Sequence, residues 1–213
     1  MLILLPPSEG KTAPRRGKPL DLGALSLPDL TPARADQVYS GVLYDALSPA
    51  TLSTAARRRA ASRLLVTSSP FGLVGPADRI PAYRLSGDAV LPGTGSVAGV
   101  WRQALGTVVE ESLGHGLLVD LRSSMYAAFW RPPTTLARRV ARVRVLHEVA
   151  GKRQVVSHFN KATKGRIVRA LLEDGANPRT PARLAEALSD LGWTVESETG
   201  RAGTRLDVIV SEV

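Results

Sequence analysis

Short apolar runs alternate with helical segments along this chain, and that alternation limits the possible folds more than any other feature. The runs at residues 1–5, 64–67 and 117–121 are apolar enough to be fully buried strands, and each ends at proline, serine or arginine. Buried strands separated by helices are typical of an α/β fold. The helices predicted between and beside these strands span residues 31–47, 48–63 and 95–114.

The second half of the chain follows a different pattern. Residues 140–149 alternate valine with arginine, which indicates a strand with one face in water. The last segments, 193–197 and 206–210, are predicted to pair as a hairpin, so the sheet should be mixed and partly antiparallel. The other elements predicted here are a strand at 154–159, a basic helix at 160–173 and a helix at 181–191.

Two segments are predicted to lack regular structure. Residues 13–33 are rich in proline, glycine and arginine and should form an irregular surface loop, and residues 68–76 are dense in turn-forming residues. With 44% hydrophobic residues, the 213-residue chain can bury a substantial core. We therefore predict one compact α/β domain over residues 1–213, with a mixed sheet flanked by helices.

Composition excludes several classes of site. The chain has no cysteine, so it has no disulfide, thiolate nucleophile or cysteine-ligated metal. Three scattered histidines supply too few further ligands, and we predict neither a metal nor another cofactor. No apolar run is long enough to cross a bilayer, and the first residues do not form a secretory signal. The sequence therefore predicts a cytoplasmic protein without a membrane partner.

Positive charge is concentrated in one part of the chain. The chain has 28 basic and 19 acidic residues, a net charge of +9, and residues 138–169 contain ten basic residues and one acidic residue. Such a concentration favours binding of a polyanion or an anionic small molecule; a solvated arginine-rich face is the alternative. Gly165 allows close approach of a backbone near Lys161 and Lys164. The residues expected to contact DNA phosphates are Arg138, Arg139, Arg142, Arg144, Lys161, Lys164, Arg166 and Arg169.

Polar residues follow the predicted strands at 8–12 and 122–126 and begin a helix at 160–164. The first of these loops ends in Gly-Lys-Thr, but Leu5 replaces the glycine that a phosphate-binding loop needs, and Pro6 and Pro7 have no N–H groups, so we reject that motif. Open α/β sheets bind ligands at the carboxyl ends of their strands. Simple turns and helix caps are the alternative.

We expect the three loops to meet in one cleft that binds an anion. The residues predicted to bind the ligand are Ser8, Lys11, Thr12, Arg84, Trp101, Arg122, Ser123, Ser124, Asn160, Lys161 and Lys164. The catalytic candidates are Lys11, Ser123, Tyr126 and Lys161, with Lys11 or Lys161 as a base or nucleophile of lowered pKa.

The order of these blocks along the whole chain resembles the YaaA family of peroxide stress proteins. The resemblance rests on the opening LILLPPSEGKT, on Tyr39-Ser40-Gly41, and on the segments SSPFGLVGPADRIPAYRL, VDLRSSMYAAF and SHFNKATKGRIVR. The chain is shorter than typical members, and its opening differs from the commoner SPAKT form.

The resemblance implies a mixed α/β fold and a cytosolic role in the response to peroxide, where it would lower free iron and so limit oxidative damage. It also implies binding of duplex or structured DNA, without sequence preference, through a basic cleft with a helix-hairpin-helix-like element. That element would correspond to residues 71–75 and their flanks. The function predicted first is therefore a DNA-binding stress protein, and the alternative is an enzyme acting on a small anionic, nucleotide-like substrate in the cleft.

Overall fold

An eight-stranded mixed sheet forms the centre of the protein. The computed structural model describes residues 1–8, 10–12, 31–149 and 151–211. In the middle of the sheet, β12, β9, β8, β1 and β3 run parallel to their neighbours, whereas β4, β10 and β11 pair antiparallel. The predicted mixed α/β fold is confirmed. The strands in spatial order are β11 (Thr194–Gly200), β12 (Gly203–Ser211), β9 (Val140–Val149), β8 (Leu118–Asp120), β1 (Leu2–Leu5), β3 (Leu64–Ser68) and β4 (Gly72–Val74), with β10 (Lys152–Gln154) also paired to β9.

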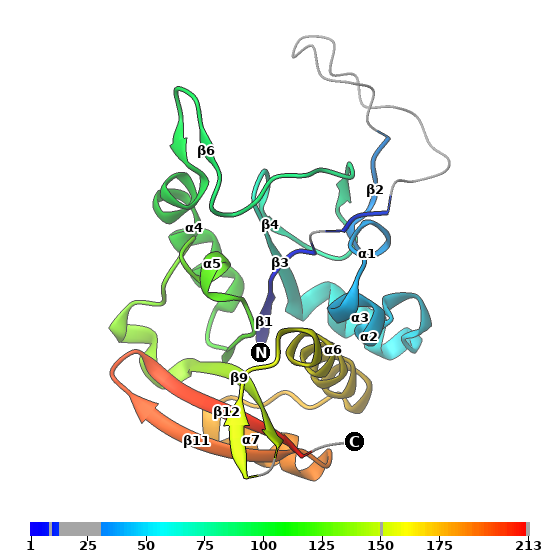
Figure 1. Cartoon of the computed structure of the whole chain (residues 1–213), viewed down its shortest axis with the longest axis vertical. Helices are drawn as coiled ribbons and strands as arrows, with labels where there is room; N and C mark the ends of the chain where they lie inside the picture. The colour runs from blue at the N-terminus through cyan, green and yellow to red at the C-terminus, as the bar shows by residue number, and fades with distance from the viewer. Residues whose placement is uncertain (9, 13–30, 150, 212–213) are drawn as a thin grey trace.

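Helices cover both faces of the sheet (Figure 1). The α-helices are α1 (Ala35–Val38), α2 (Val42–Leu47), α3 (Thr54–Arg63), α4 (Val97–Leu113), α5 (Ser124–Ala127), α6 (Ser157–Asp174) and α7 (Pro181–Asp190), and the 3-10 turns are η2 (Pro49–Thr51) and η3 (Thr134–Arg139). Two small ribbons pair β2 (Ala33–Arg34) with β5 (Arg79–Ile80) and β6 (Val90–Leu91) with β7 (Gly95–Ser96).

Successive side chains of β1 enter two separate cores, because neighbouring residues of a strand point to opposite faces. Ile3 and Leu5 pack with the residues of α1, α2, α3, α6 and α7. Leu2 and Leu4 pack on the other face, with α4, α5 and η3. All four side chains are buried, as the apolar run predicted.

Both predicted helices before β3 are interrupted. The first is split into α1 and α2 at Tyr39-Ser40-Gly41, where Gly41 has a φ of 93° and Tyr39 makes a β-bridge with Lys11. The second begins as η2, and α3 then starts after Ser53, whose hydroxyl accepts a hydrogen bond from the N–H of Ala56. Helix was correctly predicted for most of both segments, but residues 33–34 of the first form β2, and the sequence did not reveal the local breaks.

The predicted strand at residues 154–159 is wrong. Strand β10 ends at Gln154, and α6 begins at Ser157, three residues before the predicted helix. Two apolar residues of the predicted strand, Val155 and Phe159, are 54% and 57% exposed. The helix is stabilised instead by tertiary packing of its later residues, including Ile167 and Leu171, against the sheet.

Residues 68–76 contain a strand, contrary to the prediction of an irregular segment. Gly72, at a φ of 73°, starts β4, which pairs antiparallel with β3. Because strands flank the turn at residues 69–71, the helix-hairpin-helix-like element implied for residues 71–75 is not formed there.

Candidate anion-binding site

Two adjacent parallel strands, β1 and β8, send the chain to opposite faces of the sheet. The segment after β1 leads to α1, α2 and α3 on one face, and the segment after β8 leads to α5 on the other. The two outgoing segments diverge at the carboxyl ends of these strands and leave a crevice there, which is where open α/β sheets bind ligands. The fold itself therefore supports the predicted place of the site.

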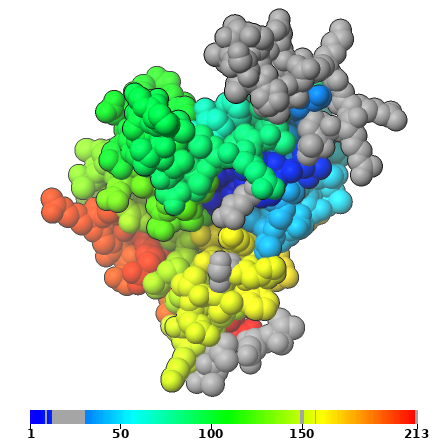
Figure 2. Space-filling model, turned by 45° about the horizontal axis from the view of Figure 1, so that its top comes forward, coloured from blue at the N-terminus to red at the C-terminus, as the bar shows by residue number. Residues whose placement is uncertain are grey.

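A hollow of about 640 Å³ opens at this point. Its lining includes Ser8 and Lys11 from the segment after β1, Tyr126 from α5, and Arg84 from the segment between β5 and β6. On this face of the molecule the first residues of the chain, in blue, lie between the green segments and α6 in yellow (Figure 2). Four predicted site residues thus meet in one place. Gly10, Leu85 and Ser86 complete the lining.

The segment after β1 is held by its own polar contacts. Lys11 Nζ donates to the carbonyl oxygen of Ser8, and it lies 4.2 Å from the centre of the Tyr83 ring, a cation–π contact. The N–H of Ser40 donates to Ser8 Oγ over 3.2 Å. These contacts keep the ammonium group of Lys11 at the hollow, where it contributes positive charge.

All four tyrosines of the chain gather around this site. The hydroxyls of Tyr39 and Tyr83 lie 3.0 Å apart, and Tyr83 accepts a hydrogen bond from Ser68. Tyr44 stacks on Tyr39 and donates to the carbonyl oxygen of Pro6, while Tyr126 lines the hollow. Burial raises the pKa of Tyr39, Tyr44 and Tyr83. These three phenols therefore stay protonated at neutral pH and serve as hydrogen-bond donors rather than bases.

A buried ion pair shapes the loop after β8. Arg122 binds Asp120 through Nε and Nη2 at 2.9 and 2.8 Å, and its remaining donors reach the carbonyl oxygens of Tyr126 and Trp130. The Arg122 side chain is only 1% exposed. Its donors are thus used within the protein, and the residue positions α5 and Tyr126 instead of reaching the hollow.

Lys164 is also buried, although it was predicted to bind a ligand directly. Its ammonium group donates to the carbonyl oxygen of Leu121 over 2.9 Å and joins α6 to the end of β8. Burial lowers the pKa of Lys164 to about 8, against an opposing effect of Asp120. The group is therefore easier to deprotonate than an ordinary lysine, as a general base requires.

Three successive hydroxyl residues at the end of β3 were missed by the sequence analysis. Thr67, Ser68 and Ser69 are buried, and the hydroxyls of Thr67 and Ser69 have no hydrogen-bond partner among the described residues. The carbonyl oxygen of Ser69 accepts a 2.6 Å hydrogen bond from Trp101, which gives this predicted site residue a role within the fold. The loops at residues 8–12 and 122–126 were predicted from polar residues that follow a buried strand. The same pattern at the end of β3 would have identified these three residues.

The other predicted ligand-binding residues do not line the hollow. Ser123 and Ser124 are exposed at the start of α5. Thr12 is also exposed, and the N–H of Thr12 donates to the carbonyl oxygen of Val38. On α6, Lys161 is exposed, whereas Asn160 is half-buried and its Oδ1 has no partner in the described part of the chain. The structure thus brings together part of the predicted set, and Ser123 and Lys161 lie outside it.

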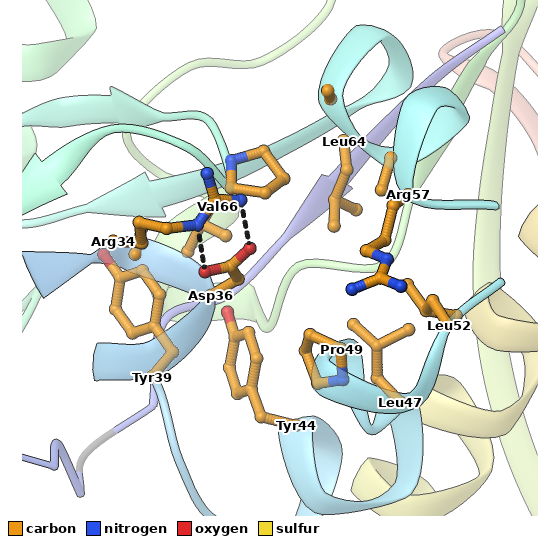
Figure 3. Close-up of a pocket in the computed structure, with 14 residues that line it drawn as sticks. Arg34, Asp36, Tyr39, Tyr44, Leu47, Pro49, Leu52, Arg57, Leu64 and Val66 are labelled. Carbon is orange, nitrogen blue, oxygen red and sulfur yellow. Dashed lines mark hydrogen bonds and ion pairs between the residues drawn. The ribbon is translucent and has the colours of Figure 1, made fainter. Parts of the chain in front are cut away.

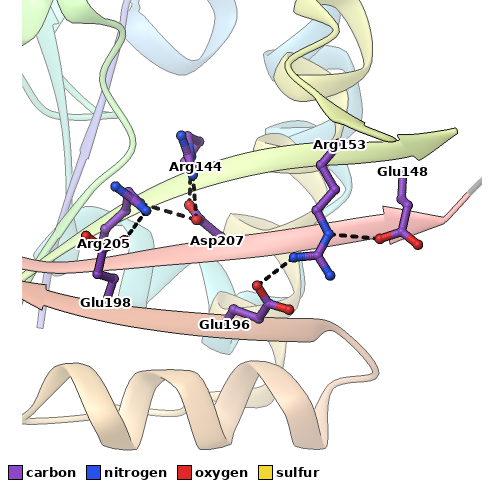
Figure 4. A network of polar contacts seen from close by, with 7 residues as sticks. All are labelled: Arg144, Glu148, Arg153, Glu196, Glu198, Arg205 and Asp207. Atoms are coloured by element: carbon purple, nitrogen blue, oxygen red, sulfur yellow. Dashed lines mark hydrogen bonds and ion pairs between the residues drawn. The ribbon is translucent and has the colours of Figure 1, made fainter. Parts of the chain in front are cut away.

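Much of the basic stretch is paired within the protein. Arg144 binds Asp207 at 2.6 Å, and Arg153 binds Glu148 and Glu196 at 2.9 and 2.7 Å (Figure 4). Arg139 donates to the carbonyl oxygens of Gly114 and Gly116, Arg142 to that of Ala202, and Arg169 to those of Leu47 and Ser48.

Four cations of this stretch make no such contact with the described residues: Arg138, Lys152, Lys161 and Arg166. Among the described residues, no group of three or more histidine or acidic side chains could hold a metal ion. No helix in this part of the chain combines the length and apolar character needed to cross a membrane.

Comparison with known proteins identifies the family. The sequence model of the family described as "Peroxide stress protein YaaA" matches residues 11–199. This chain belongs to that family. It is 47% identical to a UPF0246 protein of Streptomyces coelicolor, with 100% of both chains covered, and 36% identical to one of Corynebacterium efficiens, with 96% and 98% covered. A UPF0246 protein of Ruegeria is 31% identical over 78% of this chain and 66% of its own.

Proposed function

We propose that this YaaA-family protein serves in the peroxide stress response by binding and transforming a small anionic, nucleotide-like molecule in the hollow at the carboxyl ends of β1 and β8. The observation that supports this most is the convergence of Ser8, Lys11, Arg84 and Tyr126, from three distant segments, at the carboxyl ends of β1 and β8. Packing alone does not require such a set. Two cations there favour an anion, and the hydroxyls offer hydrogen bonds that would orient it.

Buried polar groups at the ends of β3 and β8 favour chemistry over simple binding. Lys164 has a lowered pKa, and the unpartnered hydroxyls of Thr67 and Ser69 lie at the end of β3. A buried polar group without a partner costs free energy, and such costs are concentrated at functional sites. We assign Lys11 and Arg84 to ligand binding and Tyr126, which lines the hollow, to proton transfer, and Lys164 to positioning the end of β8 through the carbonyl oxygen of Leu121.

Titration with nucleoside triphosphates and diphosphates and with pyrophosphate, followed by calorimetry, tests this proposal. Arg84→Ala should weaken binding about tenfold or more, because a hydrogen bond to a charged group contributes about 1.5–3 kcal/mol. Arg138→Ala is the matched control, since Arg138 is exposed and does not line the hollow. Equal binding by wild type and Arg84→Ala would refute the assignment of this hollow.

DNA binding is a second candidate, favoured by the exposed cations that the protein leaves unpaired. Arg138, Lys161 and Arg166 make no ion pair with the described residues, and Arg84 is exposed at the hollow. Contacts of this kind bind phosphates without sequence preference and weaken steeply as salt rises.

An electrophoretic titration of a short duplex at two salt concentrations separates the two candidates. A double variant, Lys161→Ala with Arg166→Ala, should weaken duplex binding and reduce its salt dependence, while nucleotide binding stays unchanged. Duplex binding that does not respond to salt or to this variant would exclude the second candidate.

The physiological part of the proposal is a cytoplasmic protein that limits iron-dependent oxidative damage. Its support is the family membership. Survival of a deletion strain in peroxide, complemented by wild type or by Arg84→Ala, tests whether the hollow serves this role.

A further inference from the structure

A second pocket lies on the face of the sheet covered by α1, α2 and α3 (Figure 3). Its volume is about 40 Å³, and Leu47, Leu52, Leu64 and Val66 form much of its apolar floor. One water needs about 10–15 Å³ on this measure, so the pocket has room for roughly three water-sized groups. A hydrocarbon chain of three or four carbons would fill it.

The charges at the edge of this pocket do not balance. Arg34 and Asp36 neutralise each other through an ion pair of 2.6 Å, supported by a 3.1 Å hydrogen bond. The guanidinium group of Arg57 makes no hydrogen bond or ion pair with any described residue. Figure 3 shows this group lying over the apolar floor, beside Leu52 and Pro49. The pocket therefore combines apolar walls with one uncompensated positive charge.

We propose that this pocket binds a short aliphatic monocarboxylate, with the carboxylate on Arg57 and the hydrocarbon chain against Leu47, Leu52 and Leu64. A guanidinium group matches a carboxylate in geometry and can donate two parallel hydrogen bonds to it. The apolar floor rewards each buried methylene by about fourfold in affinity. Arg57 is the one cation of the described pocket lining without an acidic partner, so a monoanion fits better than a dianion.

This site is separate from the hollow at β1 and β8. Tyr39 and Tyr44, whose rings stack, line the second pocket and do not line the hollow, and the two linings share no residue. Their hydroxyls bind Tyr83 and the carbonyl oxygen of Pro6, both next to the hollow. The proposal for the second pocket therefore stands or falls independently of the proposed function.

Ligand-detected NMR and calorimetry with butyrate test the proposal on the full chain. Butyrate should bind saturably and about fifteenfold more tightly than acetate, which buries two fewer methylenes. Butanol and butylamine should bind far more weakly, because neither offers a negative charge to Arg57.

Two variants locate the site. Arg57→Gln should weaken butyrate binding about tenfold, and Arg58→Gln, the adjacent exposed residue outside the pocket, should leave it unchanged. Ala61→Leu, at the exposed edge of the pocket, should block entry; a thermal unfolding curve checks that this variant is folded. Butanol binding as tightly as butyrate, an unaffected Arg57→Gln variant, or no saturable binding by wild type would each overturn the proposal.

Discussion

Replacing Gly165 by alanine should destabilise the protein, although helix propensity alone predicts the opposite. Gly165 lies inside α6, where alanine is favoured over glycine by about 1 kcal/mol. In the folded protein, however, α6 is in close contact with α2. A Cβ at position 165 would lie 2.2 Å from the carbonyl oxygen of Leu43 and 2.9 Å from Cβ of Ala46. The close backbone approach predicted for this glycine is therefore to a neighbouring helix.

The contact distances set the size of the effect. To restore an ordinary carbon–oxygen distance, α2 and α6 must separate by about 1 Å, which weakens the packing along their interface. Overpacking of this kind costs about 1–3 kcal/mol and occasionally more. A contact of 2.2 Å with a backbone oxygen puts this site at the upper end of that range, so after the gain of about 1 kcal/mol in propensity we expect the free energy of unfolding to fall by about 2 kcal/mol. Movement of α2 would also disturb Tyr44, which holds the carbonyl oxygen of Pro6 beside the hollow.

Urea unfolding followed by tryptophan fluorescence measures this change. The matched control is Gly106→Ala in α4, where an added Cβ would lie 3.6 Å from Nε1 of Trp130, an ordinary contact. That variant should be stabilised by about 0.5–1 kcal/mol. If Gly165→Ala proves as stable as wild type, the close packing of α2 against α6 is refuted.

Three further predictions concern the buried polar residues Lys164, Arg122 and Tyr44. Because the pKa of Lys164 is about 8 when folded and 10.5 ordinarily, the unfolded chain holds more protons between these values, so stability should rise with pH there. Between pH 7.5 and 9.5 the free energy of unfolding should rise by about 2 kcal/mol more in wild type than in Lys164→Met. Urea unfolding measures this rise, and the same rise in both proteins would contradict the prediction. Arg122→Met should cost about 3–5 kcal/mol by leaving the buried charge of Asp120 unpaired, and a second change, Asp120→Asn, should recover part of that loss in thermal unfolding. Tyr44→Phe should cost about 1 kcal/mol by removing its hydrogen bond to Pro6, and no change in urea midpoint would show that this bond is not stabilising.

Local patterns predicted the elements that bury a regular apolar face. The strands at β1, β3 and β8, the alternating strand β9, the closing hairpin and the helix α4 all lie where apolar spacing placed them. The patterns failed where tertiary contacts overrode local preference: residues 154–159 were predicted to form a strand, yet α6 begins within this segment. The prediction of one domain over residues 1–213 stays a prediction.

For the site, the sequence pointed to polar loops after strands, and Ser8, Lys11, Arg84 and Tyr126 do meet in one hollow. The sequence could not distinguish a cationic side chain that faces solvent from one that donates to a backbone carbonyl oxygen elsewhere in the protein. Lys164 and Arg122 illustrate this, since both are buried and bonded to carbonyl oxygens near the end of β8.

Apolar periodicity was thus enough to establish the class of fold, and the order of the residue blocks was enough to establish the family resemblance. Periodicity and block order are both properties of the linear sequence, so neither needs the tertiary structure. Which charges remain available to a ligand was decided only in three dimensions. Arg144 finds Asp207 across 63 positions of sequence, and Lys164 finds Leu121 across 43. The strength of an electrostatic interaction depends on distance in space and on burial, and no pattern within the chain contains either quantity.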